Sequence, residues 1–311
     1  MIAHWDETEP VRLDIGQMHL VRIDLGRAAG SKGIGLARLK VDPGAQSSAV
    51  HVHGDEEEIF YVLGGSALSW QDGKTHEVGP GDCLVHRAAA EKHTLVAGPE
   101  GVDVLAFGQR MSPTTTYLPR PGIVSFRLGF TLGETVERHV WEAEAETGDL
   151  ELPAPSPRPP NIVNLEDAES AYGGAVRYLA RSVAVRSGLN WVRLPPNERG
   201  SPPHCHSAEE ELFVVLDGGG TLELWGPPGP ERQSEPTETH DLRRGDVVSR
   251  PPGTRIAHSL LAGDAGLTYL AYGTRDSSDV CYYPRSGKVF FRGVGVIARL
   301  EQLDYSDGEP D

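Results

Sequence analysis

Cysteine is scarce in this sequence, and the few cysteines lie far apart. The 311 residues include three, Cys83, Cys205 and Cys281. An odd, widely spaced set does not make the disulfide framework of a small secreted domain. The opening segment MIAHWDETEP also has neither the basic nor the apolar region of a signal peptide. We therefore expect a cytoplasmic protein in which Cys205 and Cys281 are small packing residues.

Long apolar runs and basic clusters are missing as well. No stretch approaches the roughly 18 consecutive apolar residues that a membrane helix needs. Asp and Glu number 45 and Lys and Arg number 29, which gives a formal net charge of −16. A nucleic-acid backbone would be repelled by that charge. We expect no membrane and no nucleic-acid partner, and a small molecule as the substrate.

Helical periodicity is weak, whereas turn-forming residues are abundant. The chain has 37 glycines and 24 prolines. Segments such as EIFYVLGG (58–65) and ELFVVLDG (211–218) combine β-branched and aromatic residues and end at glycine, which is typical of strands. Many short strands separated by turns predict an all-β sandwich or barrel.

The chain contains a tandem repeat of one sequence unit. HVHGDEEEIF (51–60) is repeated as HCHSAEEELF (204–213), and HTLVAGPEGVDVLAFGQR (93–110) as HSLLAGDAGLTYLAYGTR (258–275). Between the copies lies an acidic, Pro-rich stretch without periodicity. The repeat predicts an N-terminal barrel over residues 1–145, a linker over 146–161 and a C-terminal barrel over 162–311.

Histidines and a glutamate recur at fixed positions in both units. The sets are His51, His53, Glu58 and His93 in the first unit, and His204, His206, Glu211 and His258 in the second. Residues i and i+2 of a strand share a face, so each closely spaced histidine pair points the same way. A short turn then lets the next strand present its glutamate beside them. Three imidazoles and one carboxylate suit a divalent transition metal such as Fe, Mn, Ni or Zn.

The spacing HxHxxxxE, followed by an apolar strand and then GD…H, resembles the cupin superfamily over residues 33–126 and 186–291. The resemblance implies two tandem jelly-roll β-barrels joined by the Pro-rich linker, each holding one metal ion. It assigns the eight histidines and glutamates above as the ligands, with iron as the leading metal.

Two features depart from the family pattern. The second unit keeps a Pro-x-Gly turn before its last histidine, RPPGTRIAH (250–258), whereas the first has the shorter RAAAEKH (87–93). Whether the first site still binds metal is therefore open. In addition, Ile59 and Leu212 follow the glutamates where oxalate-acting bicupins commonly have tryptophan. This departure disfavours oxalate decarboxylase.

Substrate-binding candidates come from strand parity. Phe60 and Phe213 share parity with the glutamates and are expected to line the two pockets. The strand before each histidine pair offers further candidates, although parity cannot settle which face is interior: Arg38, Lys40, Trp191 and Arg193. The remaining acids of the turns are expected to be solvated: Glu56, Glu57, Glu209 and Glu210.

Four protein ligands leave two positions open on an octahedral ion, and these positions together with the resemblance predict an enzyme. The leading hypothesis is an Fe(II) dioxygenase acting on a small aromatic, enol or diketone-type metabolite that chelates the metal. The alternatives are a non-redox isomerase, lyase or decarboxylase using Mn, Ni or Zn, and a non-catalytic binding or storage protein. Edge strands and the tandem arrangement predict a monomer or a homodimer.

Overall fold

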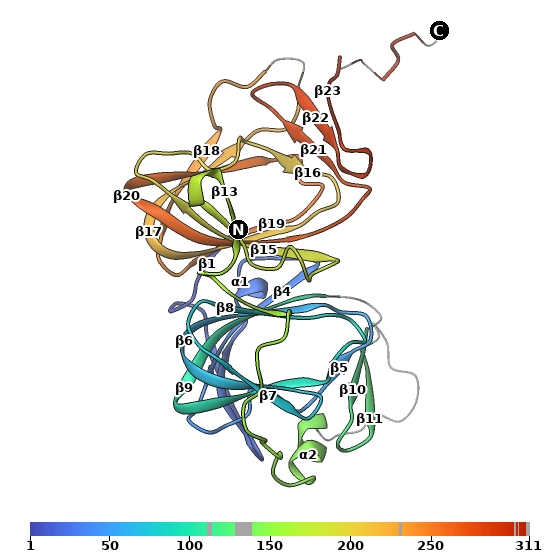
Figure 1. Ribbon diagram of the computed structural model, residues 1–311. Coiled ribbons are helices and arrows are strands. Elements are labelled where there is room, and N and C mark those ends of the chain that lie inside the picture. The colour runs from blue at the N-terminus through green and yellow to red at the C-terminus, as the bar shows by residue number, and fades with distance from the viewer. Residues whose placement is uncertain (111–113, 128–138, 230–231, 302, 304, 309–311) are drawn as a thin grey trace.

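Two β-barrels, one above the other in Figure 1, make up the computed structural model, which describes residues 1–110, 114–127, 139–229, 232–301, 303 and 305–308. Nearly all regular structure is strand, and each barrel combines a large sheet with a small one. The predicted all-β, two-barrel architecture is confirmed.

The first barrel has an eight-stranded sheet and a three-stranded sheet. The large sheet contains β2 (Pro10–Ile15), β3 (Met18–Ile23), β4 (Ile34–Val41), β6 (Glu58–Gln71), β7 (Lys74–Val78), β8 (Asp82–His86), β9 (His93–Gln109) and β12 (Ile162–Asn164). The small sheet contains β5 (Val52–His53), β10 (Thr114–Leu118) and β11 (Ile123–Arg127). Two short helices, α1 (Leu25–Ala28) and α2 (Val140–Ala145), complete this half.

The second barrel repeats this plan with sheets of eight and four strands. The large sheet contains β1 (Ile2–His4), β13 (Glu169–Ala171), β14 (Val176–Tyr178), β15 (Ser187–Leu194), β17 (Glu211–Trp225), β18 (Glu238–Arg243), β19 (Asp246–Arg250) and β20 (Ala257–Thr274). The small sheet contains β16 (Cys205–His206), β21 (Val280–Tyr283), β22 (Lys288–Phe291) and β23 (Val296–Arg299). Two 3-10 turns cover Tyr172–Gly174 and Arg292–Val294.

Each barrel receives an edge strand from the other half of the chain. The N-terminal β1 pairs with β19 of the second barrel, and β12, which follows the linker, pairs with β8 of the first. The linker itself lies along the first barrel, where the Ser156 N–H donates to the Thr75 carbonyl at 2.8 Å. The hydrogen-bonded sheets therefore interleave at the ends of the predicted domains, a feature that the repeat alone does not indicate.

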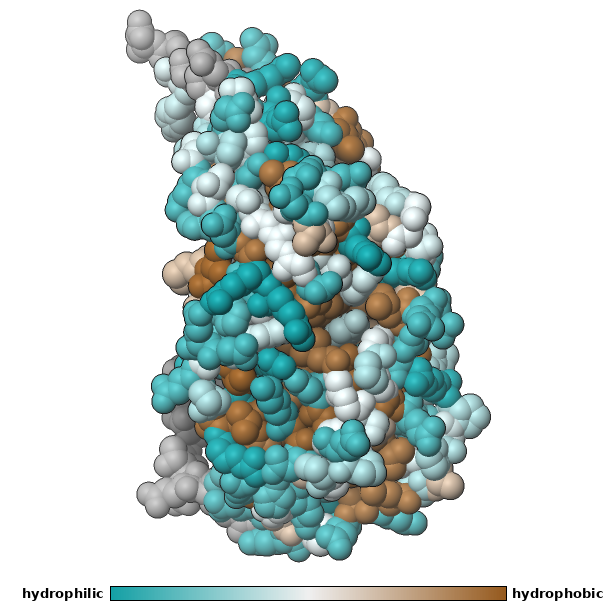
Figure 2. Space-filling view, turned by 90° about the vertical axis from the view of Figure 1, so that its left-hand side faces the viewer, coloured by the Kyte–Doolittle hydropathy of each residue, from teal (hydrophilic) through white to brown (hydrophobic). Residues whose placement is uncertain are grey.

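Strands near the middle of the molecule are apolar on both faces because each face meets a different core. In β6, Phe60 and Val62 pack inside the first barrel, whereas Ile59 and Tyr61 belong to a core shared with the second. The Phe107 and Tyr272 rings stack across this shared core at 5.0 Å. On the face drawn in Figure 2, hydrophilic residues cover most of the surface and hydrophobic ones show mainly in recesses between them.

Glutamates fasten the two barrels together reciprocally. The Glu57 carboxylate accepts hydrogen bonds from the Val185 N–H at 2.8 Å and the Ser187 hydroxyl at 2.5 Å. The Glu210 carboxylate accepts from the N–H groups of Lys32 at 2.8 Å and Gly33 at 2.5 Å.

The expectation of a solvated acidic turn is wrong for three of its four residues. Glu57, Glu209 and Glu210 are all buried.

Within the part of the chain that the structure describes, no helix is long and apolar enough to span a membrane.

Candidate metal centres

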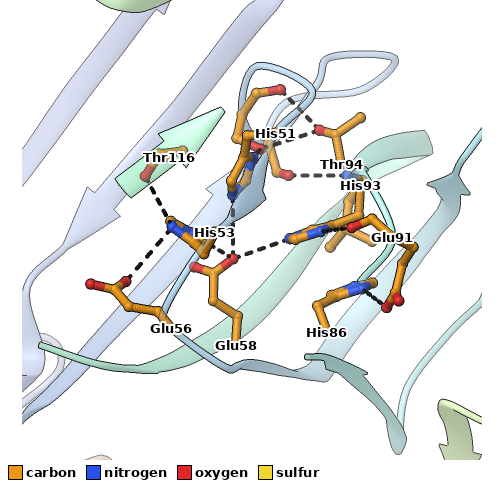
Figure 3. Close-up of polar contacts among 12 residues, drawn as sticks. His51, His53, Glu56, Glu58, His86, Glu91, His93, Thr94 and Thr116 are labelled. Atoms are coloured by element: carbon orange, nitrogen blue, oxygen red, sulfur yellow. Dashed lines mark hydrogen bonds and ion pairs between the residues drawn. The ribbon is translucent and has the colours of Figure 1, made fainter. Parts of the chain in front are cut away.

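Three histidines of the first barrel surround one carboxylate oxygen. Figure 3 shows the imidazoles of His51, His53 and His93 directed at Glu58. Their Nε2 atoms lie 3.3, 3.2 and 3.1 Å from Glu58 Oε2. His51 and His93 meet through an antiparallel bridge, and Glu58 begins β6 beside them. The local strand geometry therefore brings the four predicted ligands together.

The second barrel repeats the arrangement with its own four residues. The Nε2 atoms of His204, His206 and His258 lie 3.5, 3.4 and 2.9 Å from Glu211 Oε2. His204 and His258 form the equivalent antiparallel bridge. Ligand atoms of His204, Glu211 and His258 all lie within 4.8 Å of one another, as do those of His51, His53 and Glu58.

The shorter loop of the first unit does not displace His93. In that loop Ala89 adopts a left-handed conformation (φ 54°) and its N–H donates to the His53 carbonyl at 2.7 Å. In the second unit Gly253 (φ 69°) donates in the same way to the His206 carbonyl at 2.9 Å. Alanine thus takes a backbone conformation that favours glycine, and the turn is preserved without the Pro-x-Gly motif.

Outer hydrogen bonds orient the imidazoles so that Nε2 faces inward. The Nδ1 atoms of His51 and His204 lie 2.8 Å from the carbonyls of Ala49 and Pro202, so Nδ1–H donates and Nε2 keeps its lone pair. The Nδ1 of His53 instead meets the Thr116 hydroxyl at 3.0 Å.

Burial and charge set the protonation of these groups. Burial lowers the pKa of His93 to about 3 and that of His258 to about 4, so both are neutral near pH 7 and can act as ligands. Burial alone would raise the pKa of Glu58 and Glu211, but the surrounding imidazoles outweigh it and hold both well below the ordinary value. The glutamates are therefore carboxylates.

The second site contains polar atoms that lie close together without well-formed hydrogen bonds. Among the described residues, the Nε2 atoms of His206 and His258 and Oε2 of Glu211 are buried without a hydrogen bond of acceptable geometry. Buried polar atoms are normally paired, and two imidazole nitrogens that converge with a carboxylate oxygen match the donor set of a cation. The residues present therefore fit a divalent metal.

Cavities of different size lead to the two sites. The second barrel encloses about 490 Å³, bounded in part by His204, Glu211 and His258. The first encloses about 170 Å³, bounded in part by His51, His53 and Glu58. Val140 and Trp141 of α2 help to line the smaller cavity.

The predicted substrate residues divide into two groups. Phe60 and Phe213 line the first and the second cavity, as strand parity predicts. The structure does not bring the other four to either histidine site: Arg38, Lys40, Trp191 and Arg193. They lie on the opposite face of β4 and β15, where Arg38 binds Asp103 at 2.6 Å and covers the Trp5 ring.

Sequence reasoning overlooked residues in and next to β21 of the second small sheet. Asp279 Oδ2 lies 2.7 Å from His206 Nδ1. Burial lowers the pKa of His206, but the Asp279 and Glu211 carboxylates outweigh burial and raise this pKa to about 10. The thiol of Cys281, expected only to pack, lies with His204 and His206 in a set of ligand atoms within 4.8 Å. The match between YLPRPG (117–122) and YYPRSG (282–287) marks these strands as equivalent and was the available signal.

Comparison with known proteins identifies the repeated unit. The cupin domain family matches residues 37–107 and 190–270. The sequence has no match among curated proteins.

Solved structures of Bacillus subtilis oxalate decarboxylase are similar in fold. The structure at pH 4.6 is 18% identical, with a TM-score of 0.60, and the match covers 90% of this chain and 78% of that one. A point mutant of the same enzyme is 19% identical, with the same TM-score and coverage. A third structure, described through its Mn(II) centres, is 17% identical with a TM-score of 0.59 and the same coverage. At these identities the likeness shows the fold alone.

Proposed function

Because the chain is a two-domain member of the cupin superfamily with candidate metal ligands in each barrel, we propose that it is a metal-dependent enzyme whose reaction takes place in the C-terminal barrel. The observation that carries this proposal is the cavity of about 490 Å³ that opens onto His204, Glu211 and His258. A volume in the range of ordinary ligand pockets, bounded by metal-ligating groups, suits a small organic substrate.

The lining of this cavity favours an aromatic or enol-type substrate. Phe213 and Tyr269 present their rings edge to face at 5.9 Å, and Val192 and Leu260 add apolar surface. The arginine of the lining, Arg199, is held by the Glu223 carboxylate, with one contact at 2.8 Å. Its charge is therefore compensated, and among the described residues that line this cavity a small dianion finds no other Lys or Arg side chain.

The reaction we propose is dioxygenation at an Fe(II) centre. Bound iron supplies Lewis acidity toward substrate oxygens and redox chemistry toward dioxygen. A divalent ion held here accepts an enolate or phenolate oxygen at a coordination position that the protein leaves open. In this chain His204, His206, Glu211 and His258 would hold the ion. The Phe213 and Tyr269 rings orient the substrate, and the apolar wall limits access of water.

A second candidate is a non-redox decarboxylase, lyase or isomerase that uses Mn, Ni or Zn. The fold likeness to oxalate decarboxylase, together with the Mn(II) centres named for that enzyme, supports it. We further propose that the protein acts in the cytoplasm as a monomer or homodimer. Light scattering on the purified chain measures the assembly state.

Oxygen uptake tests the leading function. The purified chain, reconstituted anaerobically with Fe(II), is mixed with oxygenated catechol, gentisate and diketone-type substrates. Uptake that is lost in His204→Ala supports the proposal. Turnover of carboxylic-acid substrates without oxygen uptake would instead support the second candidate, and binding without product in any assay would identify a binding protein.

A further inference from the structure

The strand pair β16 and β21 brings a thiol to the second metal centre. His206 and Cys281 are directly opposite each other in this antiparallel pair, so their side chains share a face. Ligand atoms of His204, His206 and Cys281 all lie within 4.8 Å of one another. Cys281 is only 2% exposed, so its sulfur is shielded from solvent.

The same position in the first barrel holds a hydroxyl. There His53 is opposite Thr116, and the Thr116 hydroxyl lies 3.0 Å from His53 Nδ1. The two barrels therefore differ in the donor next to the second histidine. Sulfur is a much softer donor than a neutral hydroxyl, so the difference bears on the choice of metal.

Inward-facing polar atoms of the second centre converge as the donors of a bound ion would. The buried Nε2 atoms of His206 and His258 and Oε2 of Glu211 form no hydrogen bond of acceptable geometry among the described residues, although His258 Nε2 lies 2.9 Å from Glu211 Oε2. In the first centre the Nε2 atoms of His51 and His93 lie 3.3 and 3.1 Å from Glu58 Oε2. Both centres therefore gather imidazole nitrogens around one carboxylate oxygen, and they differ in the thiol that only the second one has nearby.

We propose that Cys281 is an additional, sulfur ligand of the C-terminal metal centre and that this centre therefore prefers thiophilic divalent metals more strongly than the N-terminal centre does. Bonds of about 2.1 Å to nitrogen and 2.3 Å to sulfur put two donors on one ion at most about 4.4 Å apart. The ligand atoms of His204, His206 and Cys281, which all lie within 4.8 Å of one another, are therefore close enough for one ion to bind them after a small adjustment. The thiol proton passes to solvent as the thiolate binds.

Cobalt provides a direct readout that is independent of the proposed reaction. The full-length chain is titrated with Co²⁺ under argon while near-ultraviolet thiolate-to-cobalt charge transfer is recorded. The wild-type chain is expected to develop this band to saturation at one equivalent. Cys281→Ser is expected to lose the band and to bind Zn²⁺ at the C-terminal centre about 10–100-fold more weakly in chelator competition, comparable to the loss of a supporting residue around a metal.

A matched control makes the result decisive. Cys205→Ser is that control, because Cys205 lies on the same strand pair but packs on the opposite face with Trp225 and Ala257; it should retain the band. A wild-type chain without the band, or a band that survives in Cys281→Ser, would overturn the proposal.

Discussion

The two barrels keep the same histidine and glutamate set but surround it differently. The cavity of the second measures about 490 Å³ and that of the first about 170 Å³, where Trp141 of α2 forms part of the wall. Duplication has preserved the strand pairs that hold the ligands, and the space around them has diverged. The comparison shows that ligand geometry and substrate access are separable features of this fold.

Charge near the ligands differs as well. His86 stacks on His93 at 3.7 Å and binds the Glu91 carboxylate at 2.8 Å. At the equivalent strand position the second barrel has Arg250, which pairs in register with Glu211 as His86 does with Glu58. Arg250 donates to the Ile256 carbonyl, and its buried Nε lacks a partner among the described residues. The second centre therefore lies beside an extra positive charge.

Removing one histidine from each centre tests most directly which barrel carries the reaction. His204→Ala is expected to reduce oxygen uptake by more than about 100-fold, because even supporting residues around a metal contribute roughly 10–100-fold. His51→Ala should leave uptake within about threefold, since the centres lie in separate barrels and separated sites act independently. Metal analysis should show one equivalent lost from each variant. Equal loss of activity in both would contradict a C-terminal reaction site.

The hydrogen bonds by which Glu57 and Glu210 fasten the two barrels provide a test in which the two halves should behave alike. Glu57→Ala and Glu210→Ala each remove two hydrogen bonds across the interface, and each is expected to lower the free energy of unfolding by about 1–3 kcal/mol. Denaturant titration measures the change. The exposed Glu100→Ala is the control and should stay within about 0.5 kcal/mol. A neutral effect at either buried glutamate would show that its carboxylate does not fasten the barrels.

The residue that contacts Nδ1 of the second histidine, Asp279 at His206 and Thr116 at His53, should also distinguish the two centres. Asp279→Asn weakens the 2.7 Å contact to His206 and is expected to lower metal affinity of the C-terminal centre about tenfold. Thr116→Val at the first centre removes a neutral hydrogen bond and should cost less, about threefold. Chelator competition with Zn²⁺ measures both. A larger effect at Thr116 would reverse the expected ranking.

The smallest predicted effect concerns the loops before the last histidines. Ala89→Gly relieves a left-handed alanine and is expected to stabilise the protein by about 0.5–1 kcal/mol, after allowing for glycine's greater freedom when unfolded. Gly253→Ala should destabilise it by a similar amount. Thermal unfolding of both variants checks the opposite signs. Shifts of the same sign would show that backbone conformation does not set the loop energetics.

Much of the fold and of the ligand set could be predicted because the relevant interactions are local or repeated. Alternation along a strand puts His51 and His53 on one face, and the turn after them returns Glu58 to their side. Parity also placed Phe60 and Phe213 correctly. Parity could not place Arg38 or Trp191, because β4 and β15 are apolar on both faces. In each strand one face packs inside its own barrel and the other face packs against the other barrel.

The sequence by itself determined two all-β cupin units with a histidine and glutamate set in each. Alternation of side chains along a strand and a repeated motif can both be recognised without knowing which residues are neighbours in space. Only the tertiary structure decided which cavity is large, that Glu57 and Glu210 fasten the barrels, and that Cys281 lies beside His206. These features depend on contacts between residues far apart in the chain. A local pattern states which face a side chain takes, but the partner on that face is set by packing.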